Sequence, residues 1–218
     1  MVEEPGIAAA TVTAKAYCGW DFNPATRAAT EALLAAAAAG APGASRALVS
    51  AFGASLEFGT AGLRGPMGAG SARMNDVTVV QAAQGLAVYL AAVGGDGAKR
   101  AGVVVGHDHR ALAAAGLTSH RFALLTAAAL ASAGFRVYLY EGLVATPLVP
   151  FGIRHLGAAA GVMVTASHNP KEDNGCEEGV VCVCVCGGGG RRAVAEGGRR
   201  GRGGKGAGQK AAGPLSHA

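Results

Sequence analysis

The chain has 218 residues, and half of them are hydrophobic, so it is long and apolar enough for one sizeable domain. Its formal net charge of +5 is unevenly placed, because residues 1–175 carry only +1 and the last 43 residues carry +4. This distribution excludes charge-driven binding of nucleic acid or anionic lipid by the main body and leaves it open only for the tail.

The cysteines and the first residues indicate a reducing compartment. Cys18 stands alone in the main body, and the other four cysteines, at positions 176, 182, 184 and 186, crowd into the tail. The body therefore has no disulfide framework. The chain begins with acidic residues, unlike a signal peptide, and no apolar run approaches the roughly 20 residues that a membrane-spanning helix needs. We expect a soluble, cytoplasmic protein that binds no membrane.

The first third of the chain predicts two helices and then a glycine-rich loop. Asn23-Pro24 is a typical helix start, and the alanine-rich sequence after it predicts a helix as far as Ala39. A second, short helix is predicted over 45–52. Residues 57–76 read EFGTAGLRGPMGAGSARMND. The glycines in this stretch exclude a regular helix and favour a backbone that closely approaches a ligand.

The next part of the chain alternates helices and strands. Asn75 or Asp76 should cap a long helix, and Gly94-Gly95 should stop it. Short apolar runs then predict three buried strands, separated by two helices. The predicted strands cover 102–106, 136–140 and 160–165, and the helices cover 119–133 and 146–156. Such alternation predicts a largely parallel sheet covered by helices on both faces.

Two polar clusters follow predicted strands of this sheet. They read HDHR at 107–110 and TASHNPKEDNG at 165–175. Ligands of open parallel sheets bind beyond the carboxyl ends of the strands. The position of these clusters is therefore the strongest physical indication of a functional site.

Ser167 and His168 are the candidate catalytic residues of that site. A serine hydroxyl becomes a nucleophile or a phosphoryl carrier when a base, a cation or a metal manages its charge. A capped loop without chemistry fits the same spacing equally well. A serine hydrolase is a third interpretation, but the Gly-x-Ser-x-Gly motif is absent, and adjacent Ser and His side chains point in different directions.

Several motifs, in the same order along the chain, resemble the α-D-phosphohexomutases, in the phosphoglucomutase-2 and phosphopentomutase-like branch. The motifs are EFGTAGLRGPMG from residue 57, GVVVGHDHR from 102, ATPLVPFGIRHL from 145 and GVMVTASHNP from 161. The resemblance covers about residues 20–175. It implies the first domain of such an enzyme, a three-layer α/β/α sandwich with a mostly parallel mixed sheet.

The resemblance also implies a role for each candidate residue. Ser167 would carry a phosphoryl group between the two ends of a sugar phosphate, and His168 would position groups or move protons beside it. Arg64 and Arg110 would bind phosphate or substrate. The family uses Mg²⁺, which the phosphate on Ser167 helps to bind, and glucose 1,6-bisphosphate as an activator. Lys171 and Asn174 are expected to shape the loop, and His107, His109, His120 and His155 to have packing or surface roles.

The family pattern breaks after Gly175. The family continues with an aromatic residue, a lysine and a valine, whereas here Cys176 is followed by two glutamates and a Val-Cys alternation. The aspartate-rich metal loop of the second domain is also missing, so the other metal ligands are absent from this sequence. We interpret the sequence after Gly175 as a change of reading frame or an aberrant transcript, and we expect the isolated chain to have little mutase activity.

These observations divide the chain into three parts. They are an N-terminal extension (1–19), a phosphohexomutase domain (20–175, with a helical lead-in over 20–56 and an α/β/α part over 57–175) and a low-complexity tail (176–218) that is predicted to be disordered. The alternative is a non-catalytic fragment that binds a sugar phosphate or, through its basic Gly/Arg tail, RNA. We do not expect nucleic acid as a partner, because the tail lacks the aromatic residues that stack on bases. The choice between hexose and pentose phosphates and the oligomeric state stay open.

Overall fold

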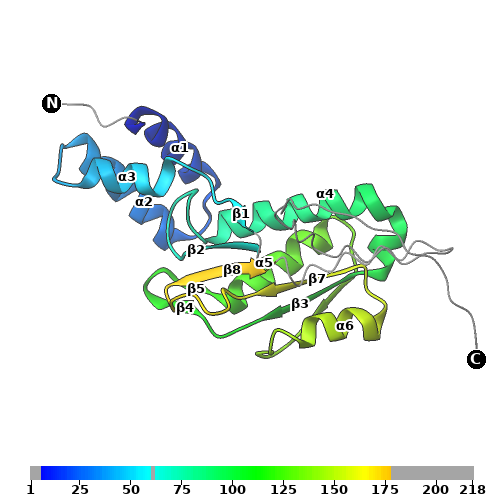
Figure 1. Cartoon of the computed structure of the whole chain (residues 1–218). Helices are drawn as coiled ribbons and strands as arrows, with labels where there is room; N and C mark the ends of the chain where they lie inside the picture. The colour runs from blue at the N-terminus through cyan, green and yellow to red at the C-terminus, as the bar shows by residue number, and fades with distance from the viewer. Residues whose placement is uncertain (1–5, 60–61, 178–218) are drawn as a thin grey trace, which may run out of the picture.

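The computed structural model describes residues 6–59 and 62–177, which form a helical lead-in and a three-layer α/β/α unit (Figure 1). The fold class predicted from the sequence is therefore confirmed. The disorder predicted for 176–218 concerns residues that, apart from the first two, lie outside this part of the chain.

The lead-in consists of three helices around a small apolar core of its own. They are α1 (Ile7–Trp20), α2 (Pro24–Ala38) and α3 (Ala44–Phe52). The rings of Tyr17 and Phe52 meet edge to face, with centroids 5.4 Å apart, and Leu48 is fully buried beside them. The predicted start of α2 is confirmed, because the Asn23 side chain accepts a hydrogen bond from the amide of Ala25 at 3.0 Å.

Helix α1 was not predicted from the sequence. Its first turn has no capping side chain, since Gly6 occupies the N-cap, and its sequence is a run of small residues without a clear apolar stripe. The helix is held by close packing instead. Ala10 and Ala14 are completely buried in the lead-in core, which brings the backbone of α1 close to α3.

The central sheet is mixed and has six strands in the order β1-β2-β8-β7-β3-β6. The strands are β1 (Phe58–Gly59), β2 (Gly62–Pro66), β3 (Val103–His107), β6 (Val137–Leu139), β7 (Ala160–Val164) and β8 (Asp173–Glu177). Strands β7, β3 and β6 are parallel, as predicted. The other half of the sheet is antiparallel, and it comes from segments that the sequence predicted to be loops. A small hairpin of β4 (Ala111–Leu112) and β5 (Leu117–Thr118), with the 3₁₀ turn η1 (Ala113–Ala115) between them, follows β3.

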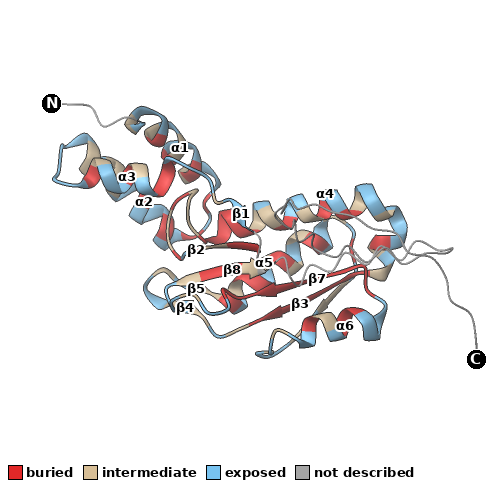
Figure 2. Ribbon diagram, viewed as in Figure 1, coloured by how far each residue is buried: buried red, intermediate tan, exposed pale blue. Residues whose placement is uncertain are grey.

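Helices cover both faces of the sheet, and the side chains of β3 alternate between them. Val103 and Val105 pack with α4 (Asp76–Ala101) and α5 (Ser119–Ser132) on one face. Val104 packs with α6 (Leu148–Leu156) on the other. All five residues of β3 are buried, and Figure 2 shows the central strands as the buried middle of the domain. Burial on both faces explains why β3 is a continuous apolar run.

Helix α4 is longer than the sequence predicted. Asn75 caps it in a reciprocal capping box with Thr78, as expected. Gly95 leaves the helical conformation, with φ 52° and ψ −145°, but the helix resumes after this kink and ends at Ala101. In length and composition α4 could therefore cross a membrane, which corrects the statement that no apolar run is long enough. Its buried residues, such as Leu90, pack against α5 and the sheet as in a core helix.

Candidate functional site

Ser167 lies in the loop that connects the adjacent strands β7 and β8. Its φ of 51° makes it the one non-glycine residue with a left-handed backbone in the part of the chain that the structure describes. Such a conformation costs on the order of 1–3 kcal/mol and persists only where surrounding contacts enforce it. The amide of Ser167 donates to the hydroxyl of Thr165 at 3.0 Å. The Ser167 side chain is exposed, and its Oγ lies 3.5 Å from Nδ1 of the equally exposed His168.

Arg64 reaches this loop from strand β2, although more than one hundred residues separate the two in sequence. Strand β2 runs antiparallel to β8, with Arg64 opposite Gly175. A Cβ atom on Gly175 would lie 2.2 Å from the carbonyl oxygen of Leu63, so a glycine is needed for the strands to approach this closely. Nη1 of Arg64 then lies 3.4 Å from Oδ1 of Asn169. The glycine-rich motif and the serine motif therefore meet at one edge of the sheet.

Arg110 contacts the serine loop, and only 9% of its side chain is exposed. Its Nε–H donates to Oδ2 of Asp108 at 3.0 Å. The four remaining N–H groups donate to backbone carbonyl oxygens of the loop and of the first residue of β8, at 2.6–3.0 Å. These carbonyls belong to Ser167, Asn169, Pro170 and Asp173. The predicted contact of Arg110 with a phosphate stays a prediction, whereas its contact with the serine loop is direct.

Asp108 connects three elements below the site. Its Oδ2 accepts from Nε of Arg110 and, at 2.7 Å, from the hydroxyl of Thr165 at the end of β7. Its Oδ1 accepts from the Arg110 amide at 3.2 Å and from the hydroxyl of Ser119, the first residue of α5. The amide group of the buried Asn174 donates to the same Ser119 hydroxyl at 3.0 Å. A fixed polar network thus supports the loop from beneath.

Sequence reasoning found the exposed members of the site and missed this supporting network. Thr165 and Ser119 received no role, and Asp108 was noted only as part of the HDHR cluster after a predicted strand. A usable signal was present. Asp108 and Arg110 follow a buried strand directly, and a buried carboxylate next to an arginine at that position requires partners of its own.

Of the two residues expected to shape the loop, Asn174 is bonded to Ser119 below it, whereas the Lys171 side chain pairs with Glu172, at 4.0 Å, and its expected role stays a prediction. The Lys171 side chain is 92% exposed, and Asn174 is buried beside the loop. Among the histidines, His107 is buried with its ring 4.9 Å from that of the exposed His120, and His155 stacks on a phenylalanine of α6. His109 is exposed next to the network. These positions agree with packing and surface roles.

The described residues do not form a metal site by themselves. No group of three or more His, Cys, Asp or Glu side chains that could hold a metal ion occurs within 6–59 and 62–177. Both carboxylate oxygens of Asp108 are occupied by hydrogen bonds, and Asp173 Oδ2 accepts from the Asn169 amide at 2.9 Å. A phosphate on Ser167 would supply one ligand, so an Mg²⁺ ion at this position would need further ligands from elsewhere.

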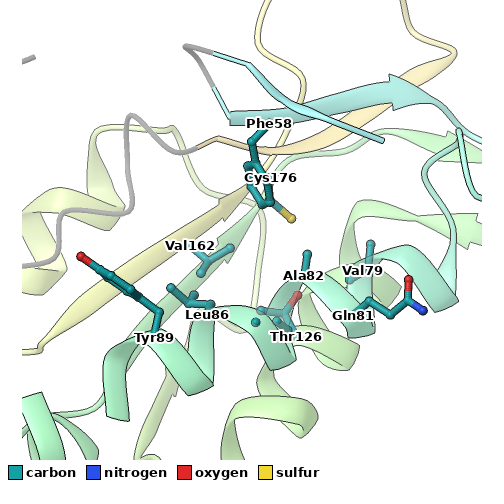
Figure 3. Close-up of a pocket in the computed structure, with 11 residues that line it drawn as sticks. Phe58, Val79, Gln81, Ala82, Leu86, Tyr89, Thr126, Val162 and Cys176 are labelled. Atoms are coloured by element: carbon teal, nitrogen blue, oxygen red, sulfur yellow. The ribbon is translucent and has the colours of Figure 1, made fainter. Parts of the chain in front are cut away.

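An apolar pocket of the domain is separate from this site. It has a volume of about 510 Å³ and lies on the face of the sheet that α4 covers, between that helix and the strands β1, β7 and β8 (Figure 3). Phe58, Leu86, Tyr89, Val162 and Cys176 line it. Burial raises the pKa of the Cys176 thiol to about 12. Among the described residues that line it, none has a cationic side chain.

The fold and the site together define a class of protein. It is a three-layer α/β/α domain that presents an exposed serine, next to a histidine, on a loop held between two strands and supported by a buried arginine.

Comparison with known proteins identifies the family. Residues 55–196 match the family described as phosphoglucomutase/phosphomannomutase, alpha/beta/alpha domain I, and the chain belongs to this family. This match runs past Gly175, where the resemblance in the sequence was expected to end. The chain is 48% identical over 156 residues to a phosphopentomutase from Mus musculus and 45% identical over 156 residues to a glucose 1,6-bisphosphate synthase from the same organism.

A phosphoribomutase from Saccharomyces cerevisiae is 49% identical over 127 residues, which cover 57% of this chain and 19% of the yeast protein. The two mouse alignments each cover 72% of this chain and 24% of the relative. The chain thus spans about a quarter of the length of these mouse relatives.

Proposed function

We propose that this chain is the phosphoserine-bearing domain of an enzyme that transfers phosphoryl groups within sugar phosphates. The observation that carries the proposal is the conformation of Ser167. A left-handed backbone holds its hydroxyl on the exposed side of a loop, beside His168 and close to a residue that Arg64 contacts, in a member of the phosphomutase family.

The arrangement of these side chains suits phosphoryl transfer. In the proposed step Ser167 Oγ attacks a phosphorus atom of a sugar bisphosphate, an Oγ–P bond forms, and the bond from phosphorus to the sugar oxygen breaks. The hydroxyl proton passes to His168, whose Nδ1 is the nearest ring nitrogen at 3.5 Å. Arg64 brings a positive charge to the same loop, and a guanidinium can stabilise the charge on the phosphoryl oxygens. The leaving sugar oxygen takes up a proton and yields a sugar monophosphate.

Mg²⁺, if bound, would neutralise phosphoryl charge. The described residues provide no complete ligand set for it, so the steps above are written without the metal. For the same reason we expect little mutase turnover from the 218-residue chain alone. We also expect a reducing, cytoplasmic compartment, where sugar phosphates are handled. Sugar phosphates as a class are the proposed ligands.

Covalent labelling of Ser167 tests the proposal. The 218-residue chain is incubated with glucose 1,6-bisphosphate and, separately, ribose 1,5-bisphosphate, both with Mg²⁺, and its intact mass and phosphopeptides are measured. We expect one phosphoryl group per chain, on Ser167, and none in Ser167→Ala. Ser132→Ala, which removes an exposed hydroxyl on α5, should accept phosphate like the unmodified chain. An unmodified chain that stays free of phosphate, or takes it up at another residue, would refute the proposal.

A coupled assay for sugar monophosphate isomerisation tests the expectation about turnover. The 218-residue chain should show no more product than Ser167→Ala when Mg²⁺ and bisphosphate are present. Robust turnover would show that the chain supplies every group that the reaction requires.

A further inference from the structure

We propose that Arg110 is a positioning residue that holds the phosphate-accepting serine in its left-handed conformation, and that it is not itself a phosphate ligand. The inference rests on the proposed function for the role of Ser167, while the geometry behind it is independent of that function. It replaces the role that the sequence resemblance implied for this arginine.

All hydrogen-bond donors of the Arg110 side chain are already used inside the protein. A guanidinium group has five N–H bonds in a rigid planar fork. All five are directed at acceptors inside the protein, one at Asp108 and four at backbone carbonyl oxygens. To bind a phosphate, Arg110 would have to break at least one of these bonds. The charge of the guanidinium is also offset by the Asp108 carboxylate, which lies 3.0 Å from Nε.

Four backbone carbonyls of the serine loop and β8 converge on Arg110. They come from residues 167, 169, 170 and 173, and all of them point at one guanidinium group, so the loop between these residues must curl around it. Carbonyl dipoles that converge on one point repel each other unless a positive charge lies between them. The carbonyl of Ser167 is directed at the guanidinium, while the Ser167 side chain stays exposed at the surface. The cation thus accounts for a backbone conformation that a serine would otherwise avoid.

A lysine at position 110 could not make the same contacts. A lysine has the same charge but only three donors on a single nitrogen, so it cannot satisfy four carbonyls and a carboxylate at once. Arg110 is itself fixed by Asp108, which is held by the hydroxyls of Thr165 and Ser119. The polar network beneath the loop therefore determines where the serine hydroxyl lies before any substrate binds.

Amide hydrogen exchange measures this positioning directly. Three loop amides are bonded within the loop: those of Ser167, Asn169 and Asp173, to Thr165 Oγ1, Ala166 O and Pro170 O respectively. In Arg110→Ala we expect these amides to exchange at least about 10-fold faster, because local opening no longer breaks the arginine bonds. Exchange in α2 and α3 should stay unchanged. Arg110→Lys should resemble Arg110→Ala. Arg154→Ala, which removes an exposed arginine from α6, serves as the matched control and should exchange like the unmodified chain.

Chemical rescue separates positioning from general stability. Guanidinium at about 10 mM is far too dilute to unfold a protein of this size, but it can enter the cavity left in Arg110→Ala. We expect it to slow exchange at the three loop amides, and to restore phosphate uptake by Ser167, whereas urea at the same concentration does neither. Loop exchange within about threefold of the unmodified chain, or acceleration spread evenly over the whole domain, would overturn the inference.

The two proposals fail in different ways. If Arg110→Ala releases the loop amides but the unmodified chain takes up no phosphate, the positioning inference stands and the proposed function does not. If the unmodified chain and Arg110→Ala accept phosphate on Ser167 at the same rate, with no effect of guanidinium, the inference fails and the proposed function stands.

Discussion

The carboxylate of Asp108 offers the sharpest test of the network beneath the serine loop. It is 84% buried, since 16% of the side chain is exposed, and it accepts four hydrogen bonds. Asp108→Asn keeps the shape of the side chain but replaces one acceptor oxygen by an NH₂ donor. The variant therefore perturbs hydrogen bonding and charge with little change in packing.

The magnitude follows from the donors that face each oxygen. The asparagine side chain can be placed in two orientations. If its NH₂ group occupies the Oδ2 position, the NH₂ faces the Nε–H of Arg110, which cannot turn away. If the NH₂ group occupies the Oδ1 position, it faces the backbone N–H of Arg110, which is equally fixed. The two hydroxyls can rotate and accept instead. One N–H group is thus left without an acceptor in either arrangement, which costs about 1–3 kcal/mol. Loss of the charged partner of a buried arginine adds to this, so we expect a total of about 2–4 kcal/mol.

Urea unfolding, followed by circular dichroism, measures this free energy. A loss of about 3 kcal/mol corresponds to a fall in Tm of about 6–12 °C for a domain of this size. Fluorescence of Trp20, the one tryptophan of the sequence, reports on the lead-in and shows whether that part unfolds in the same transition. Glu31→Gln is the control. It removes the partner of Arg27 in an exposed pair on α2, and it should cost less than about 0.5 kcal/mol. If Asp108→Asn lies within 1 kcal/mol of the unmodified chain, the network does not stabilise the domain as argued.

Three further predictions concern other parts of the domain. Arg121→Ala leaves the completely buried Asp76 without its cation and should lower the free energy of unfolding in urea by about 2–3 kcal/mol, less than for a fully buried pair because Arg121 is 39% exposed. Arg27→Ala, from an exposed pair, should cost under about 0.5 kcal/mol, and equal costs for the two variants would contradict the role of burial. Gly102→Ala places a methyl group 2.6 Å from a carbonyl oxygen, at a residue with φ 85° and ψ −178°. It should lower Tm by several degrees more than Gly116→Ala, which also has a positive φ, of 63°, but lies in the left-handed helical region with open space around it. The thiol of Cys176 should alkylate far more slowly than a free cysteine at pH 8, because burial raises its pKa to about 12. The unfolded chain loses this proton near pH 9 and the folded chain near pH 12, so the free energy of unfolding should fall as the pH rises between these values. A Cys176→Ser variant with the same pH profile as the unmodified chain would contradict this.

The sequence predicted the parallel half of the sheet well, because that half depends on local patterns. The run GVVVG is apolar at every position, since β3 is buried on both faces, and Asn75 gives the capping signal of α4. Strands β2 and β8 carry no such pattern. Gly65 and Gly175 remove the side chains that would have revealed a strand, and their pairing depends on close contact between backbones far apart in sequence.

The site shows the same division. Ser167, His168 and Arg64 were found because they occur in recognisable motifs, and the structure brings them to one loop. The function of Arg110 could not be read from its neighbours in sequence, because its acceptors are backbone carbonyls about sixty residues away. Backbone atoms are the same in every residue and leave no trace in the amino-acid pattern. The kink at Gly95 was taken for the end of a helix for a different reason: two successive glycines are a usual stop signal, whereas here the helix resumes after them.

The hairpin formed by β7, the serine loop and β8 has a consequence for variation in length. Eight residues, 165–172, join two neighbouring strands, and entropy alone would tolerate longer versions, since doubling a flexible loop costs only about 0.6 kcal/mol. An added residue, however, would shift some of the inward carbonyls out of reach of a guanidinium that cannot follow them. Insertions should therefore be rejected here by geometry and accepted in the exposed turn around Gly142, where a side chain would meet open space.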